Sequence, residues 1–204
     1  MRARPGFFLT IEGIEGSGKS TLAEALAKKI GAVREVVATQ EPGGGGLGDN
    51  IRQMLLDTSN EIPDRTELLL FEAARAYHVN TRIVPALNRG AVVICDRFTD
   101  STFAYQGYAR KISLDVINWL NDYATAGLKP DLTILLDLDP AEGLSRQKGI
   151  DRISGEEIEF HKRVRQGYLA IAGHEPDRFS VIDAGKSFEE VLRQAEKALL
   201  GILY

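Results

Sequence analysis

Cysteine is almost absent from this chain, and Cys95 is the only one among 204 residues. A single cysteine excludes an intrachain disulfide framework and any metal site built from several thiolates. Because Cys95 ends an apolar run at 91–94 and free cysteine is commonly buried, we expect a core residue and not a catalytic thiol. His161 and His174 lack ligand-like spacing to any cysteine or histidine, so we expect both at the surface and no zinc site.

Long apolar runs and an excess of positive charge are also lacking. No stretch is long and apolar enough to span a bilayer, and the apolar run at 7–11 is too short for a signal peptide. The formal net charge of −4 argues against a general nucleic-acid binder, which would show a basic excess. We therefore expect a cytoplasmic protein without a membrane or nucleic-acid partner, in which any polyanion site depends on locally clustered Arg and Lys.

The most informative motif present is the phosphate-binding loop pattern G-x-x-x-x-G-K-[ST], which reads here as Gly13-Ile14-Glu15-Gly16-Ser17-Gly18-Lys19-Ser20. It follows the apolar run at 7–11 and continues through Thr21 into a helix-prone stretch. The glycines let backbone N–H groups curl around a phosphate, and the following helix aims its positive end at the same anion. Lys19 is expected to reach the β- and γ-phosphates, and the Ser20 hydroxyl to bind Mg²⁺. The flanking strand and helix patterns disfavour the alternative of a plain Gly-rich turn.

Apolar, β-branched runs alternate with helical patterns along the whole chain. We expect short strands at 7–12, 36–40, 91–95, 132–138 and 179–183. Nearly continuous apolar strands are typical of a parallel sheet covered on both faces, and the intervening helices are long enough to be crossovers. The pattern predicts an α/β protein with a doubly wound five-stranded parallel sheet, in one domain over 1–204. Expected helices include 21–30, 49–57, 100–110, 114–126, 156–172 and 188–203.

A long helix is expected to begin near Asp64, with Glu67 as a capping-box partner. One stripe of this helix is predicted to be its core face: Leu69, Leu70, Ala73, Ala74 and Tyr77. A second face carries Phe71 one turn before Arg75, an arrangement that can stack on a nucleobase and donate hydrogen bonds to it. Periodicity alone favours a different interpretation, with Phe71 in the core and Arg75 as a solvated charge. Pro85 is expected to kink or end the helix.

The third strand delivers Asp96-Arg97-Phe98 to its carboxyl end, where ligands bind in open α/β sheets. Asp96 can hold Mg²⁺ or its waters and Arg97 can clamp transferring phosphates, although a surface ion pair is the alternative. Side chains one turn apart follow on the next helix and could read a base or sugar, or simply form an amphipathic helix: Ser101 with Tyr105, and Thr102 with Gln106. Trp119 and Tyr123 are interpreted as core or subunit interface.

Two loops complete the candidate site. The Gly-rich stretch at 41–48 is expected either to approach a ligand closely or to be an exposed turn, and it precedes a helix that carries Arg52. The basic segment at 146–152 can close over a triphosphate, with a solvated loop as the alternative. We call residues 146–156 the lid segment.

The chain resembles the bacterial thymidylate (dTMP) kinases over nearly its whole length. Besides the phosphate-binding loop, matching motifs are Glu41-Pro42-Gly43-Gly44 with Gly48 and Arg52, Glu67-Leu68-Leu69-Leu70-Phe71 with Arg75, Asp96-Arg97-Phe98 with Ser101, Ala104-Tyr105-Gln106-Gly107, Pro130-Asp131-Leu132, Asp151-Arg152 and Arg163-Val164-Arg165. Departures from the pattern are Gln40, Gly45 and Ile153-Ser154. The resemblance implies a P-loop nucleoside monophosphate kinase fold and a homodimer.

The resemblance also implies a role for each matching residue. Phe71 would stack on thymine and Arg75 would bond its polar edge. Arg52 and Arg97 would hold the dTMP phosphate, and the rest of the acceptor pocket would be Ser101, Thr102, Tyr105 and Gln106. Glu15 would lie near the acceptor sugar and phosphate. Gly16 stands where one subclass has arginine, so catalytic cations from the lid segment are implied instead: Arg146, Lys148 and Arg152.

The implied reaction is transfer of the γ-phosphoryl group from Mg·ATP to dTMP, giving dTDP and ADP, with Lys19, Arg97 and Mg²⁺ offsetting the repulsion between two polyanions. Alternatives are a kinase for another pyrimidine monophosphate such as dUMP or UMP, a nucleotide-binding regulator without transfer activity, and a catalytically inactive dimeric scaffold.

Overall fold

The computed structural model describes residues 5–147 and 149–200. Its strands form one parallel sheet in the order β2-β3-β1-β4-β5, which confirms the predicted doubly wound α/β architecture. Each strand matches its predicted range to within one residue at either end: β1 (Phe7–Gly13), β2 (Val36–Gln40), β3 (Val92–Asp96), β4 (Leu132–Asp137) and β5 (Phe179–Asp183). Among the described residues, none of the helices combines the length and apolar character needed to cross a membrane.

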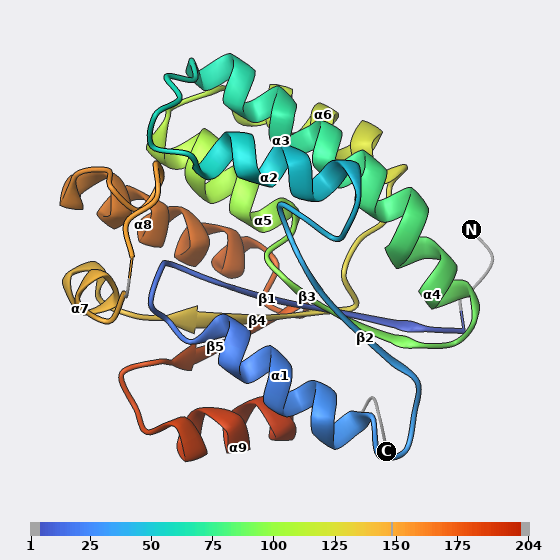
Figure 1. Ribbon diagram of the computed structural model, residues 1–204. Coiled ribbons are helices and arrows are strands. Elements are labelled where there is room, and N and C mark those ends of the chain that lie inside the picture. The colour runs from blue at the N-terminus through green and yellow to red at the C-terminus, as the bar shows by residue number, and fades with distance from the viewer. Residues whose placement is uncertain (1–4, 148, 201–204) are drawn as a thin grey trace.

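Helices cover both faces of the sheet (Figure 1). On one face lie α1 (Lys19–Ile30) and α9 (Phe188–Leu199), which contact each other. The other face carries α3 (Asp64–His78), α8 (Ile158–His174), and the shorter α2 (Leu47–Leu56) and α6 (Leu114–Thr125). Short segments complete the fold: α4 (Val84–Asn88), α5 (Thr99–Thr102) and α7 (Pro140–Ser145), with the π-helical η1 (Val79–Ile83) and η2 (Phe103–Ala109).

Alternation of side chains along the strands explains why both faces are covered. Phe8 and Val93 pack into a cluster with Val79 and Ile83 from η1, whereas Leu9, which follows Phe8, belongs to the other main cluster. The central strands are therefore apolar at successive positions, as expected for buried parallel strands.

The buried face of α3 differs from the prediction. Leu69, assigned to the core face, is 51% exposed, while Arg75 on the second face is buried, and so is His78 three residues later. The buried face is polar because its ionisable side chains find partners inside the fold, which apolar periodicity does not reveal. The capping-box prediction for Glu67 is also wrong: the residue preceding the helix is Pro63, and the Glu67 carboxylate bonds Gln106 and two arginines instead.

Pro85 does not end the long helix. Helical backbone runs from α3 through η1 into α4, where Pro85 lies in the first turn, and it ends at Asn88. Proline cannot donate to the preceding turn and its ring crowds a carbonyl there, so the wider π turn just before it relieves the conflict.

Surface predictions had mixed outcomes. Trp119 and Tyr123 are 64% and 78% exposed with stacked rings, so the core interpretation is wrong and the interface interpretation stays a prediction. Cys95 is buried as predicted, and burial holds the pKa of its thiol well above its usual range. His174 is exposed as predicted, but His161 is buried.

Candidate active site

The carboxyl ends of β1, β2 and β3 open into a cavity of about 270 Å³. The cavity is lined by every side chain that the resemblance assigned to the acceptor: Arg52, Phe71, Arg75, Arg97, Ser101, Thr102, Tyr105 and Gln106. Residues of the phosphate-binding loop and the third strand line it as well: Glu15, Gly16, Lys19, Ser20 and Asp96. Segments far apart in the sequence therefore meet in one hollow at the edge where α/β proteins bind ligands.

Two side chains of the phosphate-binding loop donate hydrogen bonds to the loop's own backbone. Gly18 has φ +90° directly before α1, a conformation suited to glycine. Lys19 Nζ donates to Ile14 O at 2.7 Å, and Ser17 Oγ donates to the same carbonyl at 2.8 Å. Burial, and secondarily the neighbouring Arg97 cation, lower the pKa of Lys19 to about 8. The lysine is thus held beside the loop and binds its proton less tightly than an exposed lysine does.

The loop also makes an unusually close contact with α7. A Cβ built on Gly16, which has φ +69°, would lie 2.0 Å from the Gly143 carbonyl oxygen. A Cβ on Gly143 would lie 2.4 Å from the Glu15 carbonyl oxygen. The loop and α7 therefore pack backbone against backbone, and neither glycine can carry a side chain without a shift.

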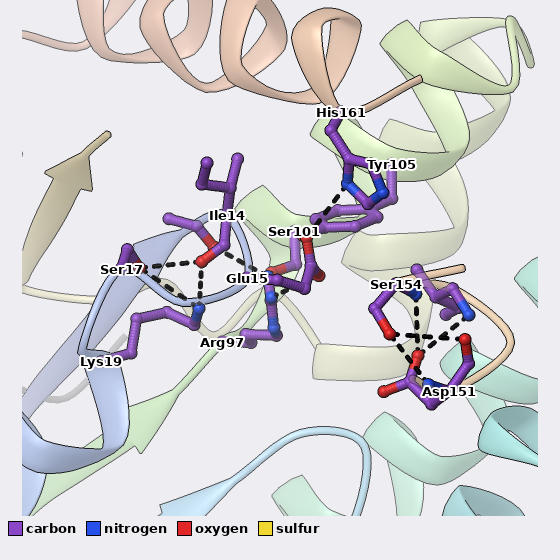
Figure 2. A network of polar contacts seen from close by, with 12 residues as sticks. Ile14, Glu15, Ser17, Lys19, Arg97, Ser101, Tyr105, Asp151, Ser154 and His161 are labelled. Carbon is purple, nitrogen blue, oxygen red and sulfur yellow. Dashed lines mark hydrogen bonds and ion pairs between the residues drawn. The ribbon is translucent and has the colours of Figure 1, made fainter. Parts of the chain in front are cut away.

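Arg97 is held in a strained and heavily bonded position. Its φ of +70° is rare for a side chain of this size. Nη1 donates to Gly13 O and to Tyr168 Oη, both at 3.0 Å. Nη2 donates to Glu15 Oε1 at 2.9 Å (Figure 2). Such fixation sets the direction in which the guanidinium meets an anion in the cavity.

Glu15 is the hub of the contacts around Arg97. Tyr105 Oη also donates to Glu15 Oε1, and His161 Nδ1 lies 3.3 Å from Glu15 Oε2 (Figure 2). Burial alone would raise the pKa of Glu15, but Arg97, His161 and Lys19 outweigh it and hold the pKa well below its usual range. Glu15 therefore stays ionised near the Arg97 and Lys19 cations.

Buried His161 is a residue that sequence reasoning missed. It is 1% exposed, and among the described residues neither ring nitrogen has a hydrogen-bond partner of good geometry. A signal was present in the sequence, since His161 precedes Val164 and Tyr168 at the i, i+3 and i+7 spacing of one helix face, and the structure buries all three on α8. The prediction looked only for metal-ligand spacing and overlooked the helix face.

Glu12, at the end of β1, was also missed. It accepts hydrogen bonds from the Phe98 N–H at 2.7 Å, Ser101 Oγ at 2.6 Å and Tyr168 Oη at 2.9 Å. Burial and the nearby Asp100 carboxylate raise its pKa to about 7. Ser101 and Tyr168, which Glu12 holds, both contact Arg97 in turn, so this carboxyl group helps to position Arg97.

Arg75 is buried, not solvated, which rules out the solvated-charge alternative. Nε donates to Glu41 Oε2 at 2.8 Å, and Nη1 donates to Glu72 Oε1 at 2.6 Å and to Thr102 Oγ1 at 2.8 Å. Phe71 packs partly against the core, as the alternative predicted, and it also lines the cavity, so its stacking on a base stays a prediction. The guanidinium is pre-oriented by carboxylates before any ligand arrives.

A pair of oxygen-bearing side chains fits the predicted magnesium site. Ser20 Oγ donates to Asp96 Oδ2 at 2.6 Å, and both residues line the cavity. Hydroxyl and carboxylate oxygens are the hard ligands that Mg²⁺ takes beside nucleotide phosphates. The donor set is therefore suited to this ion.

The predicted lid arginines are not among the described residues that line the cavity. Arg146 Nη2 pairs with Glu142 and Nη1 donates to Ala184 O at 3.1 Å. Arg152 Nη2 lies 2.6 Å from Glu67 Oε2 and Nε donates to Leu55 O at 2.8 Å. Lys148 lies outside the described residues. The lid segment instead contributes Gln147, Asp151 and Ile153 to the cavity wall.

Comparisons with known proteins agree on one family. The family model described as "Thymidylate kinase" matches residues 11–195. The chain is 47% identical to a thymidylate kinase of Desulfovibrio desulfuricans, covering 94% of each chain, and 42% identical to one of Staphylococcus haemolyticus, covering 96% of this chain and 98% of the relative. A crystal structure of thymidylate kinase from Ehrlichia chaffeensis is similar with a TM-score of 0.80 at 35% identity, covering 95% of this chain and 98% of that one.

Proposed function

This chain belongs to the thymidylate kinase family and transfers the γ-phosphoryl group of ATP to dTMP, giving dTDP and ADP; from this premise we propose how its side chains share that work. One observation carries the proposal. A single cavity is lined by the phosphate-loop residues Lys19 and Ser20 and also by Phe71 and Arg75 from α3. Donor and acceptor can therefore meet in one hollow.

The main barrier in this reaction is charge repulsion. The phosphate of dTMP has a second pKa of about 6 and is largely deprotonated at pH 7, so its oxygen attacks the γ-phosphorus without a strong general base. The bond to the β–γ bridging oxygen breaks and ADP leaves with that oxygen. Lys19 neutralises the donor phosphates, and Arg97 with Arg52 holds the acceptor phosphate. Glu15 keeps Arg97 aimed by accepting from Nη2 at 2.9 Å.

Recognition of the base falls to Phe71 and Arg75. Phe71 stacks on the pyrimidine ring, and Arg75 donates to its polar edge from a guanidinium that carboxylates already orient. The remaining wall of the acceptor pocket is Ser101, Thr102, Tyr105 and Gln106.

Mg²⁺ is the cofactor we propose beside ATP. Ser20 and Asp96 would hold it, and the ion would neutralise charge on the phosphates when bound. Chelation of divalent cations should abolish turnover, and full activity in excess chelator would refute this part.

We further propose one domain over 1–204, a cytoplasmic location and a homodimer. The dimer is supported by an exposed apolar face on two contacting helices, with Leu69 on α3 and Trp119 and Tyr123 on α6. Sedimentation should give twice the chain mass, and Tyr123→Asp should shift it toward the monomer. A monomeric wild type would refute the homodimer. A second unfolding transition would refute the single domain, and recovery of the protein in a membrane or secreted fraction would refute the cytoplasmic location.

The decisive experiment measures ADP release from Mg·ATP with separate acceptors: dTMP, dUMP, UMP, CMP, AMP and GMP. We expect the highest kcat/KM with dTMP and a loss of about tenfold or more in Phe71→Leu, the scale of lost base stacking. Phe188→Leu on α9 is the matched control, because it makes the same substitution at a ring that is 40% exposed and is not among the described residues lining the cavity; it should keep wild-type kinetics. ADP release that needs no acceptor would refute the assignment of the acceptor pocket.

A further inference from the structure

Glu67 is a buried carboxylate that the mechanism does not use. It lies on α3, its side chain is 1% exposed, and it is not among the described residues that line the cavity. Burying a carboxylate is unfavourable unless cations and hydrogen bonds compensate it. A residue placed this way needs a reason, and its partners supply one.

The two carboxylate oxygens of Glu67 hold different parts of the site. Oε1 accepts from Gln106 Nε2 at 2.9 Å, and Gln106 lines the acceptor side of the cavity. Oε2 accepts from Arg152 Nη2 at 2.6 Å, within the lid segment. Arg110 spans both oxygens, with Nε and Nη2 each at 3.1 Å. One carboxylate therefore connects the acceptor pocket to the lid segment.

Arg152 is fixed on the protein side and not on the cavity side. Besides Glu67, its Nε donates to Leu55 O at 2.8 Å, and its backbone N–H donates to Leu56 O at 3.2 Å at the end of α2. Its neighbours Asp151 and Ile153 line the cavity. The side chain thus anchors the outer side of a turn whose inner side forms the cavity wall.

The turn is also braced internally and at its far end. Asp151 Oδ1 accepts from the backbone N–H of Ile153 at 3.0 Å. It also accepts from the backbone N–H of Ser154 at 2.8 Å (Figure 2). Arg110 Nη1 lies 2.6 Å from Glu156 Oε1, so the cation that spans Glu67 also holds the end of the lid segment. Burial alone would raise the pKa of Glu67, but Arg110, Gln106 and Arg152 outweigh it and lower the pKa, so the carboxylate stays charged.

We infer that Glu67 is a positioning residue that joins Gln106 and the turn at 151–155 into one wall of the dTMP pocket, and that Arg152 acts through Glu67 and not on the transferred phosphate. The inference rests on the proposed function, because it assigns the cavity wall to the dTMP side. It replaces the direct catalytic role that the resemblance implied for Arg152.

The test compares Glu67→Gln, Arg152→Gln and the double variant in the full-length protein. The glutamine at position 67 keeps the shape but loses the charge. We expect KM for dTMP to rise about tenfold in each, the size of a lost hydrogen bond to a charged group, with kcat and KM for ATP within about threefold of wild type. The double variant should be no worse than either single variant, since both remove the same connection. Hydrogen exchange in the peptide covering 151–155 should accelerate in all three.

Glu175→Gln is the matched control. It makes the same substitution opposite Arg178, whose Nε donates to Glu175 Oε2 at 2.8 Å, and neither residue is among those lining the cavity. KM for dTMP should stay at the wild-type value there, whatever the change in thermal stability. Should Glu67→Gln fail to fold, Arg152→Gln carries the same comparison from the more exposed side of the pair.

Two results would overturn the inference. A loss of about 100-fold or more in kcat in Arg152→Gln, with Glu67→Gln near wild type, would place Arg152 directly on the phosphates. Unchanged KM and unchanged exchange at 151–155 in Glu67→Gln would show that the contacts position nothing. Wild-type turnover with dTMP tests the proposed function by itself, and hydrogen exchange decides the anchor even if that turnover is absent.

Discussion

Arg97 allows activity and backbone strain to be separated at one position. We predict that Arg97→Ala and Arg97→Gly both lose about 100-fold or more in kcat/KM for dTMP, about 3 kcal/mol of transition-state stabilisation, because both remove the cation at the acceptor phosphate. The two variants leave Glu15 equally without its 2.9 Å partner, so that cost cancels when they are compared with each other.

The stability difference between them follows from the φ of +70°. A left-handed conformation costs an alanine about 1–2 kcal/mol and a glycine almost nothing, while glycine loses about 0.5–1 kcal/mol through the greater freedom of the unfolded chain. The net expectation is that Arg97→Gly is more stable than Arg97→Ala by about 0.5–1 kcal/mol, or about 1–4 °C in Tm for a chain of this length.

The assays are ADP release with saturating Mg·ATP and thermal unfolding of both variants without ligand. Equal losses of activity with a higher Tm for the glycine variant would support both parts of the reasoning. Retention of more than a tenth of wild-type activity by either variant would refute the phosphate-holding role. A lower Tm for Arg97→Gly would refute the strain argument.

The remaining predictions concern the donor side of the cavity. Because burial and Arg97 lower the pKa of Lys19 to about 8, its charge is lost as the pH rises through 8, so kcat/KM for ATP should fall above that pH. Lys19→Met should lose about 100-fold of activity and should no longer show this fall at high pH. A fall that persists in Lys19→Met would exclude Lys19 as its source. The lowered pKa of Lys19 should affect the stability of the fold in the opposite direction. Between about pH 8 and pH 10.5 the unfolded chain binds the Lys19 proton and the native chain does not, so the contribution of Lys19 to the free energy of unfolding should rise with pH. Asp96→Asn should raise the Mg²⁺ concentration for half-maximal activity by about tenfold or more, and an unchanged Mg²⁺ titration would remove Asp96 from the metal site.

Most of the fold could be predicted from the sequence because its signals are local. The strands are short apolar runs, and the phosphate-binding loop has fixed spacing between a strand and a helix. Helix ends and the π turns were harder, since Pro85 sits inside a continuous helical path that tertiary packing keeps together.

Contacts between residues far apart in the sequence were the part of the site that the sequence predicted least well. Glu67 matched a local capping pattern, but its actual contacts are 39 and 85 positions away, at Gln106 and Arg152. His161 offered only a helix-face signal, and its neighbour Glu15 comes from the opposite end of the chain. Periodicity tells which face of a helix is buried only when that face is apolar, and here the site is built on buried faces that are charged.

The contact between Gly16 and Gly143 bears on how this enzyme could evolve. With the Gly143 carbonyl oxygen 2.0 Å from where a Cβ would sit, an arginine cannot be acquired at position 16 by one substitution unless α7 moves away first. Since a Cβ on Gly143 would in turn lie 2.4 Å from the Glu15 carbonyl oxygen, a side chain at position 143 of α7 is blocked as well. A lineage with this pairing would have to change loop and helix together, so drift toward an arginine-bearing loop passes through an intermediate that packs poorly. The two glycines therefore restrict which evolutionary changes could move a catalytic cation into the phosphate-binding loop.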